Sequence, residues 1–257
     1  MPRHKQAPPP LTAGEPSLFA RDEEAPIVVI PARYGATRLP GKALADIHGR
    51  PMVVRVLERV RRCRRVGRVV VATDDDRIFD AVTAAGELAV MTSRQHASGT
   101  DRIAEALAGL AWSGGVVINV QGDEPLVSPQ TIDALVAAMD DPEVQVATVV
   151  APLRGDPAEP STVKAVVTAA GRAVYFSRAA VPHGGPYWHH IGLYAYRAQA
   201  LARFTSTPPT PLERSERLEQ LRFLELGCPI AVVTVDEASP SVDTPADLEQ
   251  VRRIFQP

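Results

Sequence analysis

The sequence has few cysteines, no long apolar run and little excess charge of either sign. The two cysteines, Cys63 and Cys228, lack a C-x-x-C partner, which favours small core side chains over metal ligands or a disulfide. No stretch approaches the roughly 20 apolar residues that cross a bilayer, so no membrane partner is expected. A net charge of −2 argues against a protein that binds nucleic acid through bulk positive charge.

The rest of the composition is that of a globular protein. With 257 residues, of which 45% are hydrophobic and 23% charged, the chain fits one large domain or one domain with a small appendage. Residues 1–25 contain Pro8-Pro9-Pro10 and mixed charges, which predicts a disordered tail ahead of a domain at 26–257. The tail has no apolar segment typical of a secretory signal. Because the two cysteines indicate no disulfide, a reducing cytoplasm is the expected location.

From Ile27 onward, apolar stretches rich in β-branched residues alternate with amphipathic ones. Strands are predicted at residues 25–30, 69–72, 88–91, 116–120 and 144–150. Helices are expected between them, the first beginning near Pro51. We interpret Asp74–Asp76 as a helix start, where acidic residues are favoured, rather than as a metal site. Strands joined by helical crossovers predict an α/β fold with a largely parallel central sheet.

The pattern changes after Pro152. Residues 163–167 and 173–176 flank the turn sequence Ala169–Arg172, which predicts a hairpin. The later elements expected are a strand at 191–196, a helix at 213–226, a strand at 231–235 and a helix that starts after Val242-Asp243-Thr244-Pro245 and ends at Phe255.

The first predicted strand runs directly into a basic loop, residues 31–44, which reads PARYGATRLPGKAL. Its glycines allow the backbone to approach an anion, and Arg33, Arg38 and Lys42 add donors and charge, as a phosphate site requires. Only three of the chain's 28 basic residues are lysines, so a lysine in this loop indicates a specific need. The loop matches neither G-x-x-x-x-G-K-[ST] nor G-x-G-x-x-G, and an ordinary solvated loop is the alternative.

Two carboxylates are candidate ligands for a divalent cation. Asp123 follows the strand at 116–120 in the segment QGDEP, and ligands of open parallel sheets lie outside the carboxyl ends of the strands. Asp243 precedes the last helix in the segment VDTP. Mg²⁺ accepts one or two carboxylates and completes its shell with phosphate oxygens and water, as a nucleoside triphosphate site provides. A turn residue at Asp123 and a helix start at Asp243 are the structural alternatives.

Several segments occur together in one order: PARYGATRLPGKAL, HASGTDR, VINVQGDEPLV, VKAVV, YFSRA, HIGLYAYR, LEQLRFLE and VDTPADLE. Over about residues 26–255 this set resembles the 3-deoxy-manno-octulosonate cytidylyltransferase (CMP-Kdo synthetase) family. The resemblance implies a three-layer α/β nucleotide-diphospho-sugar transferase-like fold, with a smaller acceptor and dimerisation subregion at about 153–230, and a homodimer. It also implies transfer of CMP from CTP to the anomeric hydroxyl of 3-deoxy-D-manno-octulosonate (Kdo), with Mg²⁺ and release of pyrophosphate, in lipopolysaccharide biosynthesis.

The resemblance assigns site residues by matching motifs. The catalytic residues it implies are Arg33, Lys42, Asp123 and Asp243, the two aspartates being the metal ligands. The nucleotide-binding residues it implies are Arg33, Arg38, Lys42, Ser98, Gly99, Thr100, Arg102 and Gln121. The acceptor-binding residues it implies are Lys164, Arg178, His190, Tyr194, Glu219 and Gln220. Without the resemblance, Tyr194 would be interpreted as a core residue and Glu219 as a surface residue.

Two departures from the family pattern concern the acceptor. Ser161 stands where the family usually has Asn, and the segment 179–189 is shorter than its counterpart. Within that segment we interpret His183 and His189 as loop residues rather than replacements for a lost cation, since an exposed histidine is usually neutral at pH 7. Two alternatives therefore stay open: transfer of CMP to another acidic acceptor, such as a different ulosonic acid or a phosphonate, and a nucleotide-binding protein without catalysis.

Overall fold

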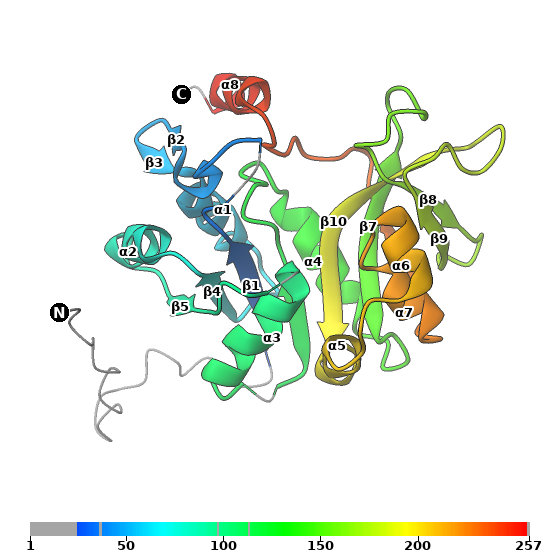
Figure 1. The fold of residues 1–257 in the computed structure, drawn as a ribbon, viewed down its shortest axis with the longest axis horizontal. Coiled ribbons are helices and arrows are strands. Elements are labelled where there is room, and N and C mark those ends of the chain that lie inside the picture. The colour runs from blue at the N-terminus through cyan, green and yellow to red at the C-terminus, as the bar shows by residue number, and fades with distance from the viewer. Residues whose placement is uncertain (1–24, 36–37, 97, 113, 256–257) are drawn as a thin grey trace.

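The computed structural model describes residues 25–35, 38–96, 98–112 and 114–255, and its centre is a nine-stranded sheet (Figure 1). Seven strands follow the order β11–β7–β10–β6–β1–β4–β5, and β8 and β9 extend the sheet from β10. The tail predicted at residues 1–25 lies outside the described residues except for Ala25, so its disorder stays a prediction.

Six of the seven strands in this order run in one direction. They are β1 (Ile27–Ala32), β4 (Arg68–Thr73), β5 (Ala89–Met91), β6 (Val116–Asn119), β7 (Val146–Pro152) and β11 (Ile230–Thr234). The pairs β1–β4, β1–β6, β4–β5 and β7–β11 are parallel, and β10 (Trp188–Arg197) runs antiparallel to both β6 and β7. The α/β class and the largely parallel sheet are therefore confirmed.

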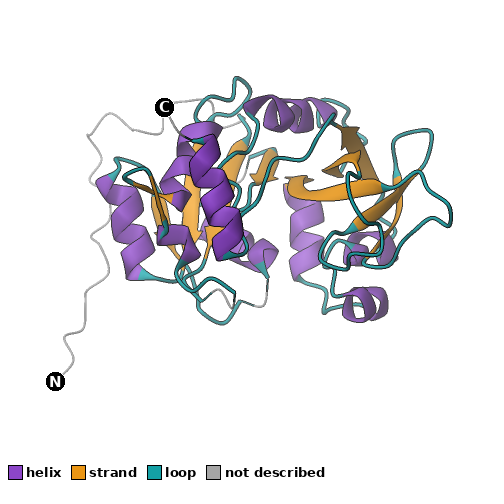
Figure 2. Ribbon diagram, turned by 90° about the horizontal axis from the view of Figure 1, so that it is seen from above, coloured by secondary structure: helices purple, strands orange, loops and turns teal. Residues whose placement is uncertain are grey.

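Helices cover both faces of this sheet, which makes three layers (Figure 2). Because successive side chains of a strand point to opposite faces, Val28 and Ile30 of β1 enter one apolar core and Ile27 and Val29 enter the other. The first core is covered by α1 (Met52–Val60), α2 (Asp76–Ala84) and α4 (Pro129–Ala138). The second is covered by α3 (Gly99–Gly109), α5 (Ala198–Thr205) and α7 (Leu221–Glu225).

The predicted hairpin after Pro152 is confirmed. Its strands are β8 (Lys164–Val167) and β9 (Ala173–Ser177), which pair antiparallel. The hairpin joins the main sheet where Trp188 of β10 pairs with Ala165. In Figure 1 this hairpin and the nearby α6 and α7 lie on the other side of β10 from α2 and β5.

Polar side chains start the helices where the sequence predicts caps. Asp75 Oδ1 accepts a hydrogen bond from the backbone N–H of Arg77 at 3.0 Å, so the acidic triplet is a helix start. Ser128 caps α4 by accepting from the N–H of Thr131. Thr244 forms a reciprocal capping box with Asp247 at the start of α8 (Pro245–Ile254).

The prediction of one long helix at residues 213–226 is wrong. Residues 213–226 form two short helices, α6 (Pro211–Glu216) and α7, because Arg217 takes a left-handed backbone conformation with φ of 56°. The spacing of buried Leu218, Leu221 and Phe223 mimics a helical face, and the turn that interrupts it is invisible in that pattern.

Other elements have no counterpart in the sequence prediction. They are α5, the 3₁₀ turn η1 (Lys42–Leu44) and the two-stranded sheet of β2 (Asp46–Ile47) and β3 (Arg50–Pro51). In addition, β10 begins earlier than predicted, so the interpretation of His189 as a loop residue is wrong, whereas His183 does lie in a turn.

Both cysteines pack against apolar cores, as predicted. Cys228 is buried beneath α7, and half-buried Cys63 follows α1, where burial raises the pKa of its thiol to about 12. None of the helices in the described part of the chain is both long enough and apolar enough to span a bilayer.

Candidate active site

A polar cavity of about 300 Å³ opens at the carboxyl ends of β1 and β6. Its lining comes from segments far apart in the sequence, which the sheet and α8 bring together: Pro31, Ala32, Arg33, Arg38, Leu39, Lys42, Ala43, His96, Ser98, Gly99, Arg102, Gln121, Gly122, Asp123 and Asp243. This position agrees with the rule that ligands of open α/β sheets bind beyond the carboxyl ends of the strands.

The basic loop is shaped by Gly41. This residue has a φ of 70°, which side-chain-bearing residues rarely adopt, and a Cβ added there would lie 3.0 Å from the Tyr34 ring. The Tyr34 ring in turn lies under the Arg77 guanidinium, 3.4 Å from its centre. The loop thus closes through the Gly41 N–H and the Tyr34 carbonyl, 3.0 Å apart, and Lys42 begins a 3₁₀ turn directly after it.

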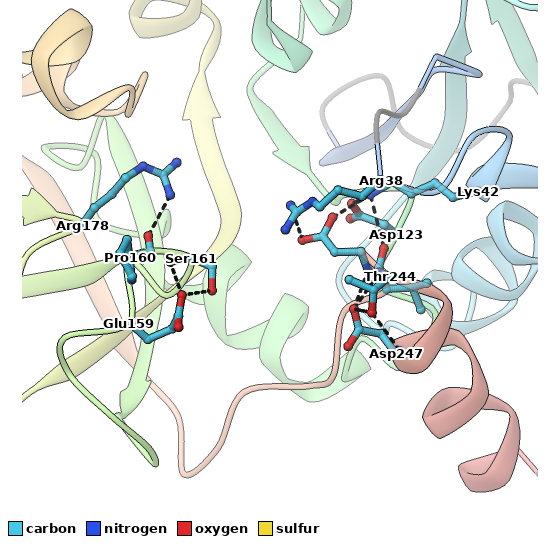
Figure 3. A network of polar contacts seen from close by, with 11 residues as sticks. Arg38, Lys42, Asp123, Glu159, Pro160, Ser161, Arg178, Thr244 and Asp247 are labelled. Atoms are coloured by element: carbon cyan, nitrogen blue, oxygen red, sulfur yellow. Dashed lines mark hydrogen bonds and ion pairs between the residues drawn. The ribbon is translucent and has the colours of Figure 1, made fainter.

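Lys42 connects the two predicted metal ligands (Figure 3). Its Nζ contacts Asp123 Oδ2 in an ion pair and lies 3.1 Å from Asp243 Oδ1 and 3.3 Å from the Val242 carbonyl oxygen. Burial alone would lower the pKa of Lys42, but its interactions with the two aspartates outweigh burial and raise it. The ammonium is therefore charged at neutral pH.

Arg38 and Arg33 complete the cationic side of the cavity. Arg38 Nη2 lies 3.0 Å from the second oxygen of Asp243, with both side chains well exposed. Arg33 is exposed at the cavity and forms no ion pair with any residue that the structure describes. Arg33 therefore has a guanidinium available to an incoming anion.

The QGDEP segment holds Asp123 in place through close backbone packing. A Cβ at Gly122 would lie 3.1 Å from the Pro31 carbonyl oxygen, so only glycine allows this approach without a shift of the chain. The Asp123 carbonyl accepts from the N–H of Val242 at 2.9 Å, which joins the segment before α8 to the sheet. The next residue, Glu124, is buried, and burial raises its pKa to about 8.

Gln121 also lines the cavity, and its position depends on a residue that sequence reasoning missed. Buried Asn119, the last residue of β6, accepts a hydrogen bond from Gln121 Nε2 at 2.8 Å. The signal was present in the sequence, because an amide at the end of an otherwise apolar strand is unusual and needs a polar partner.

The second predicted nucleotide-binding segment lies at the start of α3. Ser98 caps the helix by accepting from the N–H of Asp101, and Ser98 and Gly99 both line the cavity. Arg102 also reaches the cavity, although it is nearly buried and its guanidinium lies 2.8 Å from Asp74. Thr100 does not line the cavity; it is buried and donates to Glu219 Oε1 at 2.7 Å.

His190 and Tyr194, predicted to contact the acceptor, are both residues of β10, and their side chains lie together in the interior. The Tyr194 hydroxyl lies 3.0 Å from His190 Nε2, and the Thr148 hydroxyl lies 3.1 Å from the same nitrogen. Burial lowers the pKa of His190 to about 3, so the imidazole is neutral. Neither residue lines the cavity described above; their side chains pack in the interior on β10.

Lys164 is likewise occupied within the protein. Its side chain is fully buried, and its Nζ donates to the carbonyl oxygens of Glu159, Thr162 and Arg178 at 2.9, 2.6 and 2.6 Å. These three acceptors use all three protons of the ammonium group, so none is left to donate to a sugar. Lys164 therefore has a structural role.

Arg178 lies apart from the Arg38–Lys42–Asp123 group (Figure 3). Its Nε donates to the Glu216 carbonyl at 3.1 Å and its Nη1 donates to the Pro160 carbonyl at 3.0 Å. Sequence reasoning missed Glu216, whose carboxylate also accepts from the Arg178 N–H at 3.0 Å and the Ser177 hydroxyl at 2.7 Å. Its signal was weak, because one glutamate on a charged helix resembles any surface residue.

Glu219 and Gln220 carry buried polar atoms without a partner among the described residues, Oε2 and Nε2 respectively. Burial raises the pKa of Glu219. Glu219 lines a second cavity of about 790 Å³, which shares Ser98 and Gly99 with the first. The structure thus places Glu219 next to the nucleotide-side loop, whereas Gln220, Lys164 and His190 line neither of these two cavities.

The fold and the cavity together indicate the class of protein to which this chain belongs. A largely parallel sheet between two helical layers, with cations and carboxylates converging at the carboxyl ends of its strands, forms an α/β nucleotidyltransferase. The cytidylyltransferase family model matches residues 27–230. A 4-diphosphocytidyl-2C-methyl-D-erythritol synthase from Anaerococcus prevotii has the same fold, with a TM-score of 0.63 over 92% of this chain and all of its own, at 14% identity.

The chain belongs to the 3-deoxy-manno-octulosonate cytidylyltransferase family. It is 52% identical over 238 residues to the enzyme of that name from Bradyrhizobium sp. (strain ORS 278), across 89% of this chain and 96% of the relative. The enzyme from Azorhizobium caulinodans is also 52% identical, across 89% and 95%. A structure described as CMP:2-keto-3-deoxy-manno-octonic acid synthetase complexed with CTP is 43% identical, with a TM-score of 0.85, across 90% of this chain and 98% of its own.

Proposed function

We propose that this protein transfers CMP from CTP to the anomeric hydroxyl of Kdo, forming CMP-Kdo and releasing pyrophosphate. The observation that carries the proposal is the convergence of Arg38, Lys42, Asp123 and Asp243 at one cavity. The name of the CTP-complexed structure supports the nucleotide, and the names of the relatives support the acceptor.

The proposed cofactor is Mg²⁺, held by Asp123 and Asp243. These carboxylates already share one cation, the Lys42 ammonium, so their oxygens face a common point. Within the described ranges no cluster of three His, Cys, Asp or Glu converges as a cation site, so phosphate oxygens and water would supply the remaining ligands, as Mg²⁺ prefers. When bound, the ion would neutralise phosphate charge and acidify the attacking hydroxyl.

The cations of the loop would bind and orient the triphosphate. Arg33 and Arg38 are exposed at the cavity and suit bidentate contacts with phosphate oxygens. The anomeric oxygen would bond to the α-phosphorus in line as the bond to pyrophosphate breaks. Because phosphoryl transfer depends mainly on positioning and charge stabilisation, this arrangement provides what the step needs.

The acceptor would bind beside the nucleotide, on the side of β9 and β10. Glu219 lines the second cavity and has a carboxylate oxygen without a described partner, which suits a sugar hydroxyl. Arg178 uses Nε and Nη1 for backbone carbonyls, so the N–H groups of Nη2 are left for the carboxylate of a sugar acid.

Another acidic acceptor is the second candidate. The shortened segment 179–189 contains no lysine or arginine, and burial lowers the pKa of His189, which leaves it neutral at pH 7. The clamp for the acceptor carboxylate therefore depends on Arg178, whose geometry does not distinguish one ulosonic acid from another.

The test is pyrophosphate release from CTP and Mg²⁺ with Kdo and a panel of other ulosonic acids and phosphonates. We expect release with Kdo and CTP, and much less with UTP. Release only with another acid would keep the nucleotide assignment and overturn the acceptor. CTP binding without release for any acceptor would favour a nucleotide-binding protein without catalysis.

Asp123→Asn separates the enzyme from the non-catalytic alternative. This substitution keeps the side-chain shape but removes the charge that holds a cation. We expect turnover to fall by a factor on the order of 10²–10³, as for removal of one preorganised electrostatic group. A thermal unfolding curve like that of the wild type would show that the loss is chemical.

We also propose a homodimer in the cytoplasm, without nucleic-acid or membrane partners. Strand β9 forms a ladder only with β8 among the strands that the structure describes, and an isolated bridge between Arg172 and Ala231 of β11 touches only its start, so most of its second edge forms no ladder. Val174 on this strand is 54% exposed, which is high for a β-branched apolar residue. An edge strand with an exposed apolar residue suits a second copy of the chain.

A further inference from the structure

The Lys42 ammonium lies between the two carboxylates proposed as metal ligands. Besides its ion pair with Asp123, Nζ lies 3.1 Å from Asp243 Oδ1 and 3.3 Å from the Val242 carbonyl oxygen. These three acceptors match the three protons of an ammonium group. The side chain of Lys42 is only 18% exposed, so protein atoms rather than water satisfy the charge.

The second oxygen of Asp243 is also engaged, because Arg38 lies 3.0 Å from it. Both aspartates are therefore neutralised by side chains of the basic loop. The same loop carries the cations that would hold a triphosphate. One set of positive charges thus has two possible anionic partners: the carboxylates of the protein and the phosphates of a nucleotide.

An ammonium and a divalent ion cannot occupy this position together. Mg²⁺ lies about 2.0–2.1 Å from its oxygen ligands, so an ion bound by both carboxylates would be within a few ångströms of Nζ. Like charges at that separation repel strongly in a partly buried site. The pair Asp123 and Asp243 therefore serves either Lys42 or the metal.

We propose that Lys42 holds the place of the divalent cation in the nucleotide-free protein, so that metal and nucleotide load together. The triphosphate gives Lys42 and Arg38 a replacement anion, and their departure frees the carboxylates for the ion. Each ligand then raises the affinity for the other by the same factor. This inference rests on the proposed function, because it takes Asp123 and Asp243 as the metal ligands.

The test is a titration of the nucleotide-free, full-length protein with Mn²⁺ alone, followed by electron paramagnetic resonance of the free ion. We expect weak binding by the wild type and tighter binding by Lys42→Met, which leaves both carboxylates without their ammonium partner. The expected gain is about 5- to 150-fold, the usual range of coupling between two ligands. Adding Asp123→Asn to Lys42→Met is expected to abolish the gain.

Arg154→Met is the matched control, since it also removes a cation from a carboxylate, that of Glu237, on an exposed surface outside the site. Its Mn²⁺ affinity is expected to equal that of the wild type. Equal affinities for the wild type and Lys42→Met would overturn the inference, as would a gain that survives Asp123→Asn. Pyrophosphate release by the wild type is measured separately, so failure of the inference and failure of the proposed function are distinguishable.

Discussion

Lysines at two positions in the described chain serve different purposes. Lys42 lies in a cavity, where its charge is matched by carboxylates that another cation could take over. Lys164 is fully buried, and its ammonium group donates hydrogen bonds to three backbone carbonyl oxygens. Scarcity of lysine indicated a specific need at Lys42, but only the surroundings distinguish a binding residue from a structural one.

Lys164→Met is expected to destabilise the protein by about 2–4 kcal/mol, because carbonyl groups that the ammonium satisfies lose their donor. Urea unfolding would measure the loss, and the affinity for CTP is expected to stay unchanged. Arg154→Met provides the control for loss of an exposed cation. A stable Lys164→Met protein with a raised KM for Kdo alone would instead make Lys164 an acceptor ligand.

Stability at low pH is expected to depend on His190. Burial lowers its pKa in the folded protein to about 3, whereas the unfolded chain has the ordinary value of 6.5. Between these values the unfolded state binds more protons, so stability falls as pH drops below 6.5, by up to about 1.4 kcal/mol per pH unit. Urea unfolding of the wild type and His190→Gln at pH 7.5 and pH 5 would measure this contribution.

The expected result is that His190→Gln loses about 2 kcal/mol less stability than the wild type between those two pH values. The glutamine amide retains a hydrogen-bonding group near Thr148 and Tyr194, so the comparison isolates the charge. The same loss in both proteins would mean that His190 becomes protonated without unfolding.

At the scale of elements, the break between α6 and α7 has the largest effect on the site. A continuous helix would carry Glu219 on a regular surface, whereas the turn at Arg217 directs it to the Thr100 hydroxyl. The same segment places Glu216 against Arg178. Two groups proposed to contact the acceptor therefore depend on a conformation that helical periodicity does not predict.

Arg217→Gly tests the turn between α6 and α7, because the turn and a continuous helix predict opposite changes in the free energy of unfolding. Glycine adopts a φ of 56° without the steric cost that a side chain carries, so we expect the free energy of unfolding to rise by about 0.5–1 kcal/mol. Within a continuous helix the same substitution would lower it by about 1 kcal/mol. Thermal or urea unfolding decides between the two, and a loss of stability would restore the single helix.

For the whole molecule, the sheet has two parts with different tasks. The parallel part around β1, β4 and β6 supports the basic loop and Asp123, while β8, β9 and α6 support Arg178 and Glu219. Antiparallel β10 joins them, pairing with β6, β7 and β8. Strand β9 lies on the side of the molecule remote from β5 (Figure 1).

Val174→Lys is expected to convert the proposed dimer into a monomer, because a charge on an edge strand opposes pairing with a second sheet. Size-exclusion chromatography with light scattering would measure the mass of both proteins. Val174→Ile, which keeps the apolar surface, is the control. A wild-type monomer, or a dimer that survives Val174→Lys, would contradict the use of this edge.

The sequence by itself determined the class of fold, most strands, the helix caps and the family. Those features are local: β-branched runs form buried strands, and Ser128 or Thr244 caps a helix through its nearest backbone groups. Only the tertiary structure decided what each charged side chain faces. Lys42 meets aspartates 81 and 201 positions away, and the helix predicted at 213–226 breaks where long-range contacts outweigh its periodicity. Electrostatic and packing interactions act through space, so the contacts of a side chain are determined only when distant segments fold together.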